Sequence, residues 1–536
     1  MSVPLTRRNF LERLGLAGGS AAVLQGAVAL GLTPVAATAD PLSRPMPSGD
    51  GRSVVLLGGG LSSLMACLEL ERAGFECTIL EASHRFGGRN LTLRSGDLID
   101  EMGFQRRCEF DDEPHLYFNA GPARIPAHHR LLLHYCKTLG VELEPFVNVD
   151  YNAWTQDDAA FGGKRVRQRH YVAEARGFLA ELAGKLSREG VLDEALNADD
   201  VERFMGFLRS YGDLDSNLVY RGSARGGYRQ SGNLSPTPGM LEPGQLQPGL
   251  DFSEILKSDF WRYKMHFGES EDQSAPLMQP RGGMDAIVHA FVRNIRSPKY
   301  TGAVVQRIRV LDDGVDVVYQ RDGAHHRLRA DYCLNCIPVH LLAGIDHNFP
   351  ARYTEALNSI GRGKLFKLGI QMNQRFWEDE GIYGGISWTS QPIEQVWYPP
   401  HGTHLPSGVM LAAYTFDPAH AELFARMPPE ERYASALAQL EKLHPQVKQH
   451  AHTFVSVPWQ RMNFHMGCTA KWSDTARSRY FPYLQRPLHG RHLLMGDQMS
   501  YHPGWQEGAF SSAHHAIQQL QSQAAAPRGA ESVATR

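Results

Sequence analysis

The sequence predicts a mixed fold, in which an α/β domain built on a parallel sheet is joined to an α+β part. Residues 53–80 have the pattern strand, glycine turn, helix, strand, which is the repeating unit of parallel sheets. Apolar runs at 302–311 and 314–323 are separated by a short turn and predict a hairpin. A strand within 492–497 and a helical pattern at 508–521 then close the chain.

The first unit can be assigned element by element. Ser53–Leu57 is a short apolar run, and Leu61–Ala73 has apolar residues at helical spacing. Gly74 ends that helix, because glycine is the residue that most readily adopts the left-handed conformation after a helix. The second strand is then expected at Glu76–Leu80.

Later elements are predicted in the same way. A second amphipathic helix is expected at 127–139, with Pro126 at its start and Gly140 after its end. Residues 166–220 are mainly helical in pattern. Residues 222–249 are too long and too rich in Gly and Pro for a simple connection, and we expect a surface excursion rather than a flap over a site. Further strands are expected at 332–338, 365–372 and 409–416.

Composition bounds the size and the partners of the protein. The chain has 536 residues, 42% hydrophobic and 21% charged, which suits two or three globular domains. A formal net charge of -2 argues against a nucleic-acid partner, since such binding needs a concentrated basic field. The one basic run, at 164–170, is expected to be a solvated surface.

The cysteines do not indicate a disulfide framework. There are seven in a chain of this length. Cys333 and Cys336 have redox or metal spacing, but residues i and i+3 of a strand face opposite sides, so we expect core packing. No other set of His, Cys and carboxylate residues has convincing zinc spacing, and we predict no metal site.

The N-terminus resembles a twin-arginine export signal. Arg7 and Arg8 precede a weakly apolar Gly/Ala-rich run that ends in the small residues Ala37–Ala39. Residues 1–39 are therefore expected to direct the protein to the periplasm or outside the cell, loaded with its cofactor before export. The alternative is a membrane-anchoring helix, but so many Gly and Ala residues make a stable anchor unexpected.

The glycine turn predicts a dinucleotide site. Residues 58–63, GGGLSS, match GxGxxG with Ser63 in place of the third glycine. The turn follows a strand and opens a helix, so a pyrophosphate can approach its backbone. Glu81 ends the next strand, where a carboxylate can accept a hydrogen bond from a ribose hydroxyl. The turn alone does not separate FAD from NAD.

Further motifs resemble the flavin amine oxidase family. Residues 81–90, EASHRFGGRN, are similar to its second glycine motif, with Arg85 and Arg89 beside Gly87–Gly88. Residues 493–517 are similar to its closing flavin motif, and 279–291 followed by Val304–Val305 are similar to its middle portion. The resemblance extends over about 53–518 and implies FAD. Neither His502 nor any cysteine is placed for a covalent link, so the FAD is expected to be non-covalent.

The resemblance implies a Rossmann-like FAD-binding domain of the glutathione-reductase type, assembled from discontinuous segments, with a sheet domain for the substrate and a helical subdomain. The expected FAD-binding segments are 51–115, 276–342 and 488–522. The substrate domain would be 116–130 and 343–487, the helical subdomain 131–275 and a flexible tail 523–536.

The resemblance also implies the cofactor residues. A Gly-acid pair, Gly496 and Asp497, would meet the ribityl chain, and the backbone amide of Gln506 would donate to the flavin pyrimidine ring. The full expected cofactor set is Gly58, Gly60, Leu61, Ser62, Ser63, Glu81, Ala82, Arg85, Gly88, Arg89, Gly121, Pro122, Ala123, Arg124, Val305, Asp497 and Gln506.

Within this family, Arg124 favours amino acids over simple amines. It lies in YFNAGPARIP (117–126), and residues 119–140 are similar to the L-amino acid oxidase segment whose arginine holds the substrate carboxylate. The resemblance assigns Tyr414 to the same carboxylate and Lys367 to a catalytic position that holds a water near flavin N5. It places Gly504 and Trp505 beside the substrate. Trp388, Trp505 and Tyr414 suggest an aromatic-rich pocket.

The resulting hypothesis is oxidative deamination of an L-amino acid by hydride transfer from Cα to flavin N5, with release of a 2-oxo acid, ammonia and hydrogen peroxide. The expected partners are an L-amino acid and oxygen, and a homodimer is a family expectation only. The alternatives are an amino acid 2-monooxygenase, an amine or polyamine oxidase, and, from a different class, an exported non-catalytic flavin-binding protein.

Overall fold

A computed structural model describes residues 48–188, 197–229 and 243–524. The contacts divide the chain into Met1–Gly49 and Asp50–Arg536, and the fold described below is that of the second unit. The expected export signal, residues 1–39, and residues 525–536 of the expected tail lie outside the described residues. Among the helices in the described ranges, none is both long and apolar enough to cross a bilayer.

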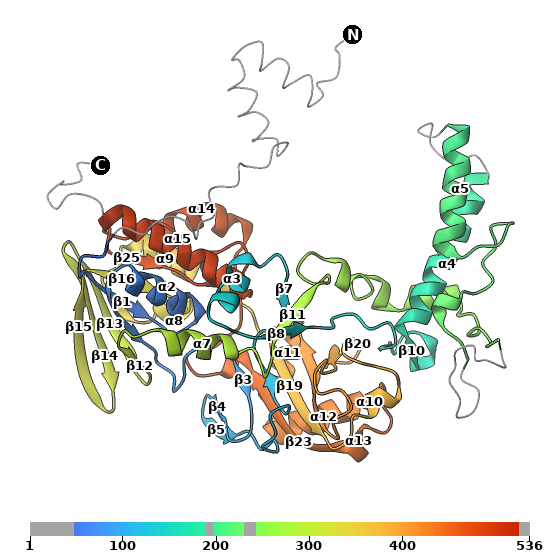
Figure 1. Cartoon of the computed structure of the whole chain (residues 1–536), viewed down its shortest axis with the longest axis horizontal. Coiled ribbons are helices and arrows are strands. Elements are labelled where there is room, and N and C mark those ends of the chain that lie inside the picture. The colour runs from blue at the N-terminus through green and yellow to red at the C-terminus, as the bar shows by residue number, and fades with distance from the viewer. Residues whose placement is uncertain (1–47, 189–196, 230–242, 525–536) are drawn as a thin grey trace, which may run out of the picture. The chain divides into compact units, whose positions relative to one another are not determined.

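A five-stranded parallel sheet forms the first layer, with strand order β12-β2-β1-β16-β25 (Figure 1). Its strands come from three distant parts of the chain, each inside one of the segments 51–115, 276–342 and 488–522. The bounds are β1 Ser53–Leu57, β2 Glu76–Leu80, β12 Lys299–Tyr300, β16 Tyr332–Asn335 and β25 His492–Leu494.

Two further layers cover this sheet. Val55 and Leu57 of β1 share a core with an antiparallel sheet on one side, whose members are β13 Val304–Leu311, β14 Gly314–Arg321 and β15 Ala324–Ala330, with β17 Asp346–His347 beside β13. This confirms the expected hairpin at 302–323. On the other side three helices pack together, namely α2 Leu61–Arg72, α7 Ala286–Asn294 and α15 Gln506–Ala524.

A seven-stranded sheet, in the order β10-β9-β20-β21-β22-β19-β23, forms the second part of the fold. Phe366 and Leu368 of β19 share a core with the helices on one face. Because strand side chains alternate, Lys367 between them points to the opposite face. The strands are β9 Trp154–Gln156, β10 Arg165–Arg167, β19 Phe366–Met372, β20 Ile386–Thr389, β21 Gln395–Trp397, β22 Gly408–Thr415 and β23 Ala451–Pro458; the helices are α10 Phe376–Asp379, α11 Pro418–Arg426, α12 Pro429–Leu440 and α13 Val447–His450.

Small sheets and short helices complete the connections. A three-stranded sheet, β7-β11-β8, carries the segment that leads out of Arg124. Its strands are β7 Ile125–Pro126, β8 Leu143–Pro145 and β11 Leu277–Pro280. The other elements are β3 Thr92–Leu93, β4 Leu98–Glu101, β5 Phe104–Arg107, β6 Phe118–Asn119, α3 Arg130–Thr138, α6 Phe252–Lys257, α8 Val339–Leu342, α9 Ala351–Asn358, β18 Gly361–Arg362, β24 Ala470–Lys471 and α14 Asp474–Leu484.

The prediction of a helical subdomain at 131–275 was wrong in part, because three strands also lie in this segment. The segment does contain α4 (Gln168–Arg188) and α5 (Ala198–Gly212), but β9 and β10 join the seven-stranded sheet and β8 joins the three-stranded one. Strands of three residues are too short for their periodicity to be recognised in a sequence. Of the predicted loop 222–249, residues 230–242 lie outside the described part of the chain.

The helix predicted at 127–139 begins later than expected, at Arg130. Pro126 is not its first residue, because it lies in β7 opposite Leu277 of β11. Gly140 follows the helix with a φ of 69°, as a residue after a helix end often does.

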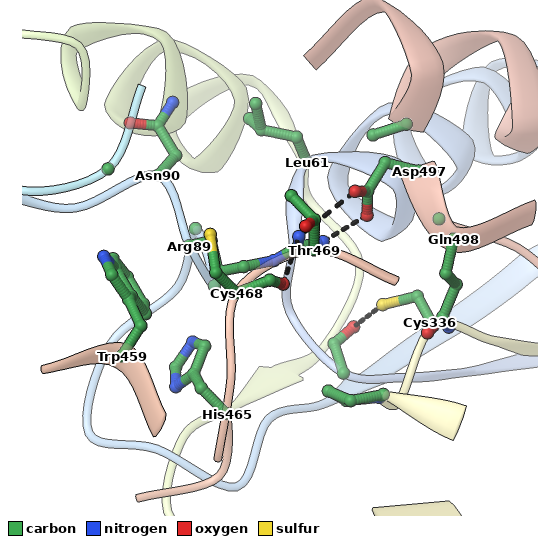
Figure 2. Close-up of a pocket in the computed structure, with 18 of the residues that line it drawn as sticks. Leu61, Arg89, Asn90, Cys336, Trp459, His465, Cys468, Thr469, Asp497 and Gln498 are labelled. Atoms are coloured by element: carbon green, nitrogen blue, oxygen red, sulfur yellow. Dashed lines mark hydrogen bonds and ion pairs between the residues drawn. The ribbon is translucent and has the colours of Figure 1, made fainter. Parts of the chain in front are cut away.

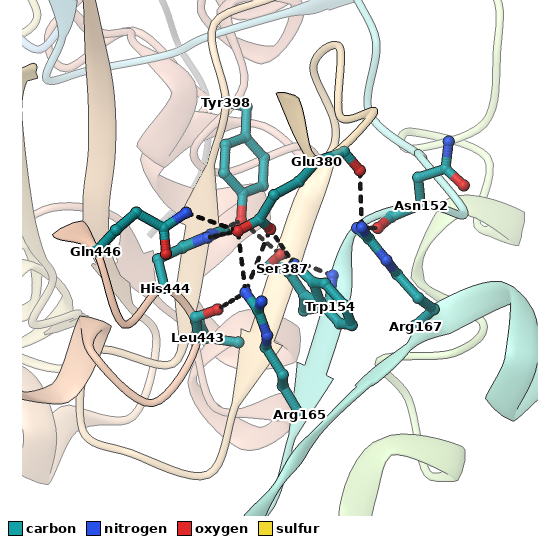
Figure 3. Close-up of polar contacts among 10 residues, drawn as sticks. All are labelled: Asn152, Trp154, Arg165, Arg167, Glu380, Ser387, Tyr398, Leu443, His444 and Gln446. Carbon is teal, nitrogen blue, oxygen red and sulfur yellow. Dashed lines mark hydrogen bonds and ion pairs between the residues drawn. The ribbon is translucent and has the colours of Figure 1, made fainter. Parts of the chain in front are cut away.

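A polar cluster joins β9 and β10, at one edge of the seven-stranded sheet, to the segments that carry Glu380 and Gln446 (Figure 3). The Glu380 carboxylate accepts hydrogen bonds from Trp154 Nε1 at 2.5 Å and from Gln446 Nε2 at 2.8 Å. Arg165 Nη1 lies 3.1 Å from the same carboxylate, and the guanidinium of Arg167 lies 3.6 Å from the centre of the Trp154 ring. The residues that make these contacts lie far apart in the chain, so the local sequence pattern does not reveal them.

Candidate active site

One cavity of about 630 Å³ extends from the glycine turn after β1 to the face of the seven-stranded sheet that carries Lys367. Its walls come from the β1–α2 turn, the stretches 80–90 and 120–124, the strands β19 and β22, and the start of α15. Part of its lining is drawn in Figure 2. The cavity therefore lies where the parallel sheet and the seven-stranded sheet meet.

The two glycine motifs lie against each other at one end of the cavity. Gly87 N donates to Gly59 O at 2.8 Å, and Gly59 N donates to Glu81 Oε2 at 2.5 Å. A Cβ on Gly59 would lie 2.6 Å from the Phe86 ring, so only glycine fits. Helix α2 starts after Gly60 with no side-chain cap, which leaves its first backbone N–H groups available to an anion.

Ser63, in place of the third glycine, packs against a thiol. Its hydroxyl lies 3.0 Å from Cys336 Sγ, and a Cβ on Gly58 would lie 2.8 Å from the same sulfur. Cys336 lines the cavity, whereas Cys333 is fully buried in the core. The expectation of core packing is thus correct for Cys333 and wrong for Cys336. Ser63 does not line the cavity itself, and its expected contact with the cofactor stays a prediction.

Arg85 does not reach the cavity either. Its guanidinium donates to the carbonyls of Phe86, Gly88 and Asn90, at 3.2, 2.6 and 3.2 Å. The side chain therefore stabilises the second glycine motif, and its direct contact with the cofactor stays a prediction. A sequence cannot separate these two roles, because both place an arginine beside a glycine turn.

Arg89 and Asp497 form a buried ion pair across the cavity wall (Figure 2). Arg89 also donates to Cys468 O at 2.7 Å, and Asp497 accepts from Gly504 N at 2.6 Å. Burial raises the pKa of Asp497, but the charge and hydrogen bonds of Arg89, the charge of Arg362 and the Gly504 N–H together outweigh it and lower the pKa below its usual value. The acid is therefore ionised and holds the 496–504 turn in place.

Arg362 is a cavity residue that the sequence analysis missed. Burial and the neighbouring charge of Arg89 lower its pKa to about 10, and its Nε and Nη1 are buried without a hydrogen-bond partner. A cation in this state is stabilised by an anionic ligand. Only the fold brings β18 to the cavity, so no pattern in the sequence pointed to this residue.

Gln506 opens α15 at the cavity. Its side-chain Oε1 and Nε2 are both buried without a partner. Buried amides are nearly always hydrogen-bonded, so these atoms fit a ligand that supplies both a donor and an acceptor. A flavin pyrimidine ring has that alternation, and together with the anion-binding turn at α2 and Glu81 the lining fits FAD.

The loop 119–124 is held from two sides. Gly121 approaches Arg89 so closely that an added Cβ would lie 2.0 Å from Arg89 O. From the other side, Lys367 Nζ donates to Gly121 O at 2.6 Å and to Asn119 O at 3.2 Å. Trp459 Nε1 donates to Ala120 O at 3.1 Å. These contacts fix the backbone immediately before Arg124.

Lys367 is almost completely buried and lies in β19 opposite Tyr414 of β22. Its Nζ is 4.3 Å from the centre of the Tyr414 ring. Burial, with a smaller contribution from the charge of Arg124, lowers the pKa of Lys367 to about 7. The side chain therefore exchanges a proton near neutral pH, unlike an ordinary lysine.

Arg124 is a buried cation with a neutral partner. It donates from Nη2 to Gln273 Oε1, and its Nε has no partner. The guanidinium lies 4.8 Å from the Trp397 ring and 5.2 Å from the Trp505 ring. A hydrogen bond joins it to Tyr414, whose pKa burial raises above its usual value, so the phenol remains a donor. Gln273 was not anticipated from the sequence.

The aromatic walls differ in part from the prediction. Trp505, Tyr414, Phe416 and Trp459 line the cavity, but Trp388 does not. Trp388 instead packs edge-on against Tyr263 and Phe267 at 5.7 and 5.2 Å.

Most of the predicted site residues do meet at this cavity. The residues that line it are Gly58, Gly60, Leu61, Ser62, Glu81, Ala82, Gly88, Arg89, Gly121, Pro122, Ala123, Arg124, Val305, Lys367, Tyr414, Asp497, Gly504, Trp505 and Gln506.

Comparison with protein families agrees with this arrangement. The model of the flavin containing amine oxidoreductases matches residues 61–520. The chain belongs to this family. Members bind a flavin, which is the cofactor class that the cavity fits.

Relatives and solved structures extend the comparison. An L-amino-acid oxidase of Demansia vestigiata is 26% identical over 478 residues, covering 86% of this chain and 85% of the relative. A flavin-dependent L-tryptophan oxidase of Lentzea aerocolonigenes is 26% identical over 492 residues, covering 88% and 98%. Among solved structures, a putrescine oxidase bound to putrescine has a TM-score of 0.58 at 17% identity, covering 88% of this chain and 99% of that one. Cyclohexylamine oxidase of Brevibacterium oxydans IH-35A has a TM-score of 0.57 at 15%, with the same coverage. The structures establish the fold.

The close approach at Gly121 gives a first prediction. Gly121→Ala should weaken flavin binding about tenfold or more, because relieving the clash with Arg89 O carries overpacking strain of about 1–3 kcal/mol. Flavin content and affinity are measured by titrating the apoprotein and following visible absorbance. Gly206→Ala is the control, since a Cβ there meets no atom within 4 Å. Wild-type flavin affinity in Gly121→Ala would contradict the argument.

Proposed function

We propose that the protein is an FAD-dependent L-amino acid oxidase, which converts L-amino acids to 2-oxo acids with release of ammonia and hydrogen peroxide. The observation that carries this proposal is Arg124, a buried guanidinium at the cavity whose hydrogen-bond partner is an uncharged amide. A buried cation without a counter-ion is costly, and a substrate carboxylate would compensate it.

Arg124 and Tyr414 are suited to bind a carboxylate together. The guanidinium can offer two parallel N–H donors, and the neutral phenol can offer a third. The guanidinium lies over the rings of Trp397 and Trp505, and these contacts restrict its position. A carboxylate fixed in this way sets the position of the attached Cα, and such alignment supplies much of an enzyme's rate.

The cofactor we propose is non-covalent FAD. When bound, it supplies the acceptor for a hydride from Cα and passes the electrons on to oxygen. Cys336 and Cys468 line the cavity, although the sequence placed no cysteine for a covalent link. Burial raises the pKa of both thiols, however, and the thiol form is a poor nucleophile.

Lys367 supports the reaction through its proton state. The neutral amine has two N–H groups, which the carbonyls of Asn119 and Gly121 can both use, and one lone pair. Because the pKa of Lys367 is about 7, its amino group loses the third N–H as the pH rises through neutrality. The nitrogen then has a lone pair in place of that donor. The lone pair can then accept a hydrogen bond from a water in the cavity.

The rival functions share the cavity but use Arg124 differently. An amine oxidase, the activity named for the putrescine and cyclohexylamine relatives, has no carboxylate to bind and leaves Arg124 unused. A 2-monooxygenase would use the same clamp and differ only in its amide product. A non-catalytic flavin-binding protein would not need a lysine with a pKa near 7.

Export is a separate part of the proposal. Arg7 and Arg8 and the Gly/Ala-rich run support translocation of a folded, flavin-loaded protein to the periplasm or beyond. Western blots of cell fractions from the native host, with Arg7→Lys/Arg8→Lys as the comparison, would place the protein.

The first test measures the reaction products of the wild type and the kcat/KM of an Arg124 variant. Wild-type protein should produce 2-oxo acid and hydrogen peroxide from L-amino acids, whereas Arg124→Ala should lose about 100-fold or more of kcat/KM, because the carboxylate loses a charged partner. Arg262→Ala is the control, since this arginine also lies over a tryptophan but is exposed. An amide product, or higher activity on decarboxylated amines than on amino acids, would contradict the proposal.

The pKa of Lys367 predicts how kcat/KM depends on pH. In the wild type, kcat/KM should rise with pH through an apparent pKa of about 7, since deprotonation creates the acceptor. Lys367→Met should lose this limb and keep only the rise due to the substrate amine. Lys364→Met is the matched control, because Lys364 is exposed and paired with Glu422 at 3.0 Å. A wild-type profile in Lys367→Met would remove the lysine from the mechanism.

The flavin linkage can be tested directly. Acid precipitation should release all flavin into the supernatant, because buried thiols at Cys336 and Cys468 are protonated. Flavin retained in the wild-type precipitate, but released from Cys468→Ala, would show a covalent bond instead.

A further inference from the structure

A cluster of three side chains lies next to the substrate clamp and takes no part in it. Asp272 Oδ1 is 2.9 Å from His128 Nε2 and 3.1 Å from His129 Nε2. All three atoms lie within 4.8 Å of one another. We propose that these atoms bind a divalent transition-metal cation of the Zn²⁺ type, and that the cation controls access to the substrate clamp.

The donor set and its spacing suit this cation. Two imidazole nitrogens and one carboxylate oxygen are a common set for zinc, with the remaining position filled by water. In a tetrahedral zinc site neighbouring ligand atoms are about 3.3 Å apart, so the two Nε2–Oδ1 distances of 2.9 and 3.1 Å need only small outward shifts. The consecutive rings of His128 and His129 are edge-on, 4.8 Å apart, which lets both Nε2 atoms turn to one point.

The cluster is open to solvent on one side and rigid on the other. The side chain of His128 is 37% exposed, which provides a path for the cation and for a water ligand. His129 is buried and packs edge-on against Trp505, with ring centres 5.1 Å apart. One ligand therefore packs directly against Trp505, a residue of the wall of the proposed substrate site.

The affinity should be moderate. His129 Nδ1 is buried without a hydrogen-bond partner, whereas the ligating histidines of tight sites usually donate from their second nitrogen. Missing support of this kind weakens binding about 10–100-fold. We therefore expect micromolar rather than nanomolar affinity, which suits a site that fills and empties.

The segment 270–274, here called the strap, connects the cluster to Arg124. Asp272 is followed by Gln273, whose Oε1 accepts from Arg124. Asn148 Nδ2 donates to Gln273 O at 2.8 Å, so the residue after Asp272 is held through both its side chain and its backbone. Gln273 occupies Nη2 of Arg124, a donor that a bidentate substrate carboxylate would use, and a cation on Asp272 would hold Gln273 in place through the strap.

Metal binding is tested without any substrate. The flavin-loaded, untagged full chain is titrated with ZnCl₂ in a non-chelating buffer by calorimetry, and bound metal is counted after equilibrium dialysis. Asp272→Asn and His128→Ala should each weaken the tightest zinc site about tenfold or more. His134→Ala, an exposed histidine of α3 outside the cluster, should not. Equal zinc affinity in Asp272→Asn, or no saturable binding by wild type, would overturn the site.

The effect on turnover rests on the proposed function. Saturating zinc should raise KM for an L-amino acid about fivefold or more in wild type and leave it unchanged in Asp272→Asn. An unchanged KM in zinc-loaded wild type would overturn the coupling through the strap. If no L-amino acid is oxidised at all, the proposed function fails, whereas the calorimetric result still decides the metal site.

Discussion

The site depends on one buried amine, Lys367, and the two backbone carbonyls to which it donates. The amine lies on β19, which pairs with β22 on one side and β23 on the other, and the carbonyls of Asn119 and Gly121 belong to the loop before Arg124. The sheet thereby positions the proposed substrate arginine through three residues of backbone. Exclusion of water has two effects here. It lowers the pKa of Lys367, and it strengthens the hydrogen bonds of the amine to the two carbonyls.

The cavity is maintained by contacts between segments far apart in the chain. The Arg89–Asp497 pair joins the second glycine motif to the turn before α15, and Cys336 fills the space that Ser63 and Gly58 leave at the first motif. Each of these contacts closes a wall from residues that lie hundreds of positions apart. A change in one segment is therefore expected to alter cofactor binding even when the glycine turn itself is intact.

Several buried polar groups at the cavity are only partly satisfied by the protein. The Gln506 amide, Arg362 and the Nε of Arg124 all have atoms without partners, although buried polar atoms nearly always have them. The groups lie at the positions where the proposed flavin and carboxylate would bind. The cavity is thus prepared for polar ligands, and the free energy of binding includes the satisfaction of these groups.

The sequence by itself determined the local units: the strand, turn and helix at 53–80, the hairpin at 302–323 and the glycine motifs, because these depend on residues close in the chain. It also placed Arg124 and Lys367, through motifs similar to those of one family. It could not determine that Arg85 donates to the carbonyls of its own glycine motif, that three-residue strands within 131–275 join other sheets, or that Arg362 and Gln273 reach the site. Only the tertiary structure decided these points, because each depends on which distant backbone a side chain meets, and local patterns carry no information about that partner.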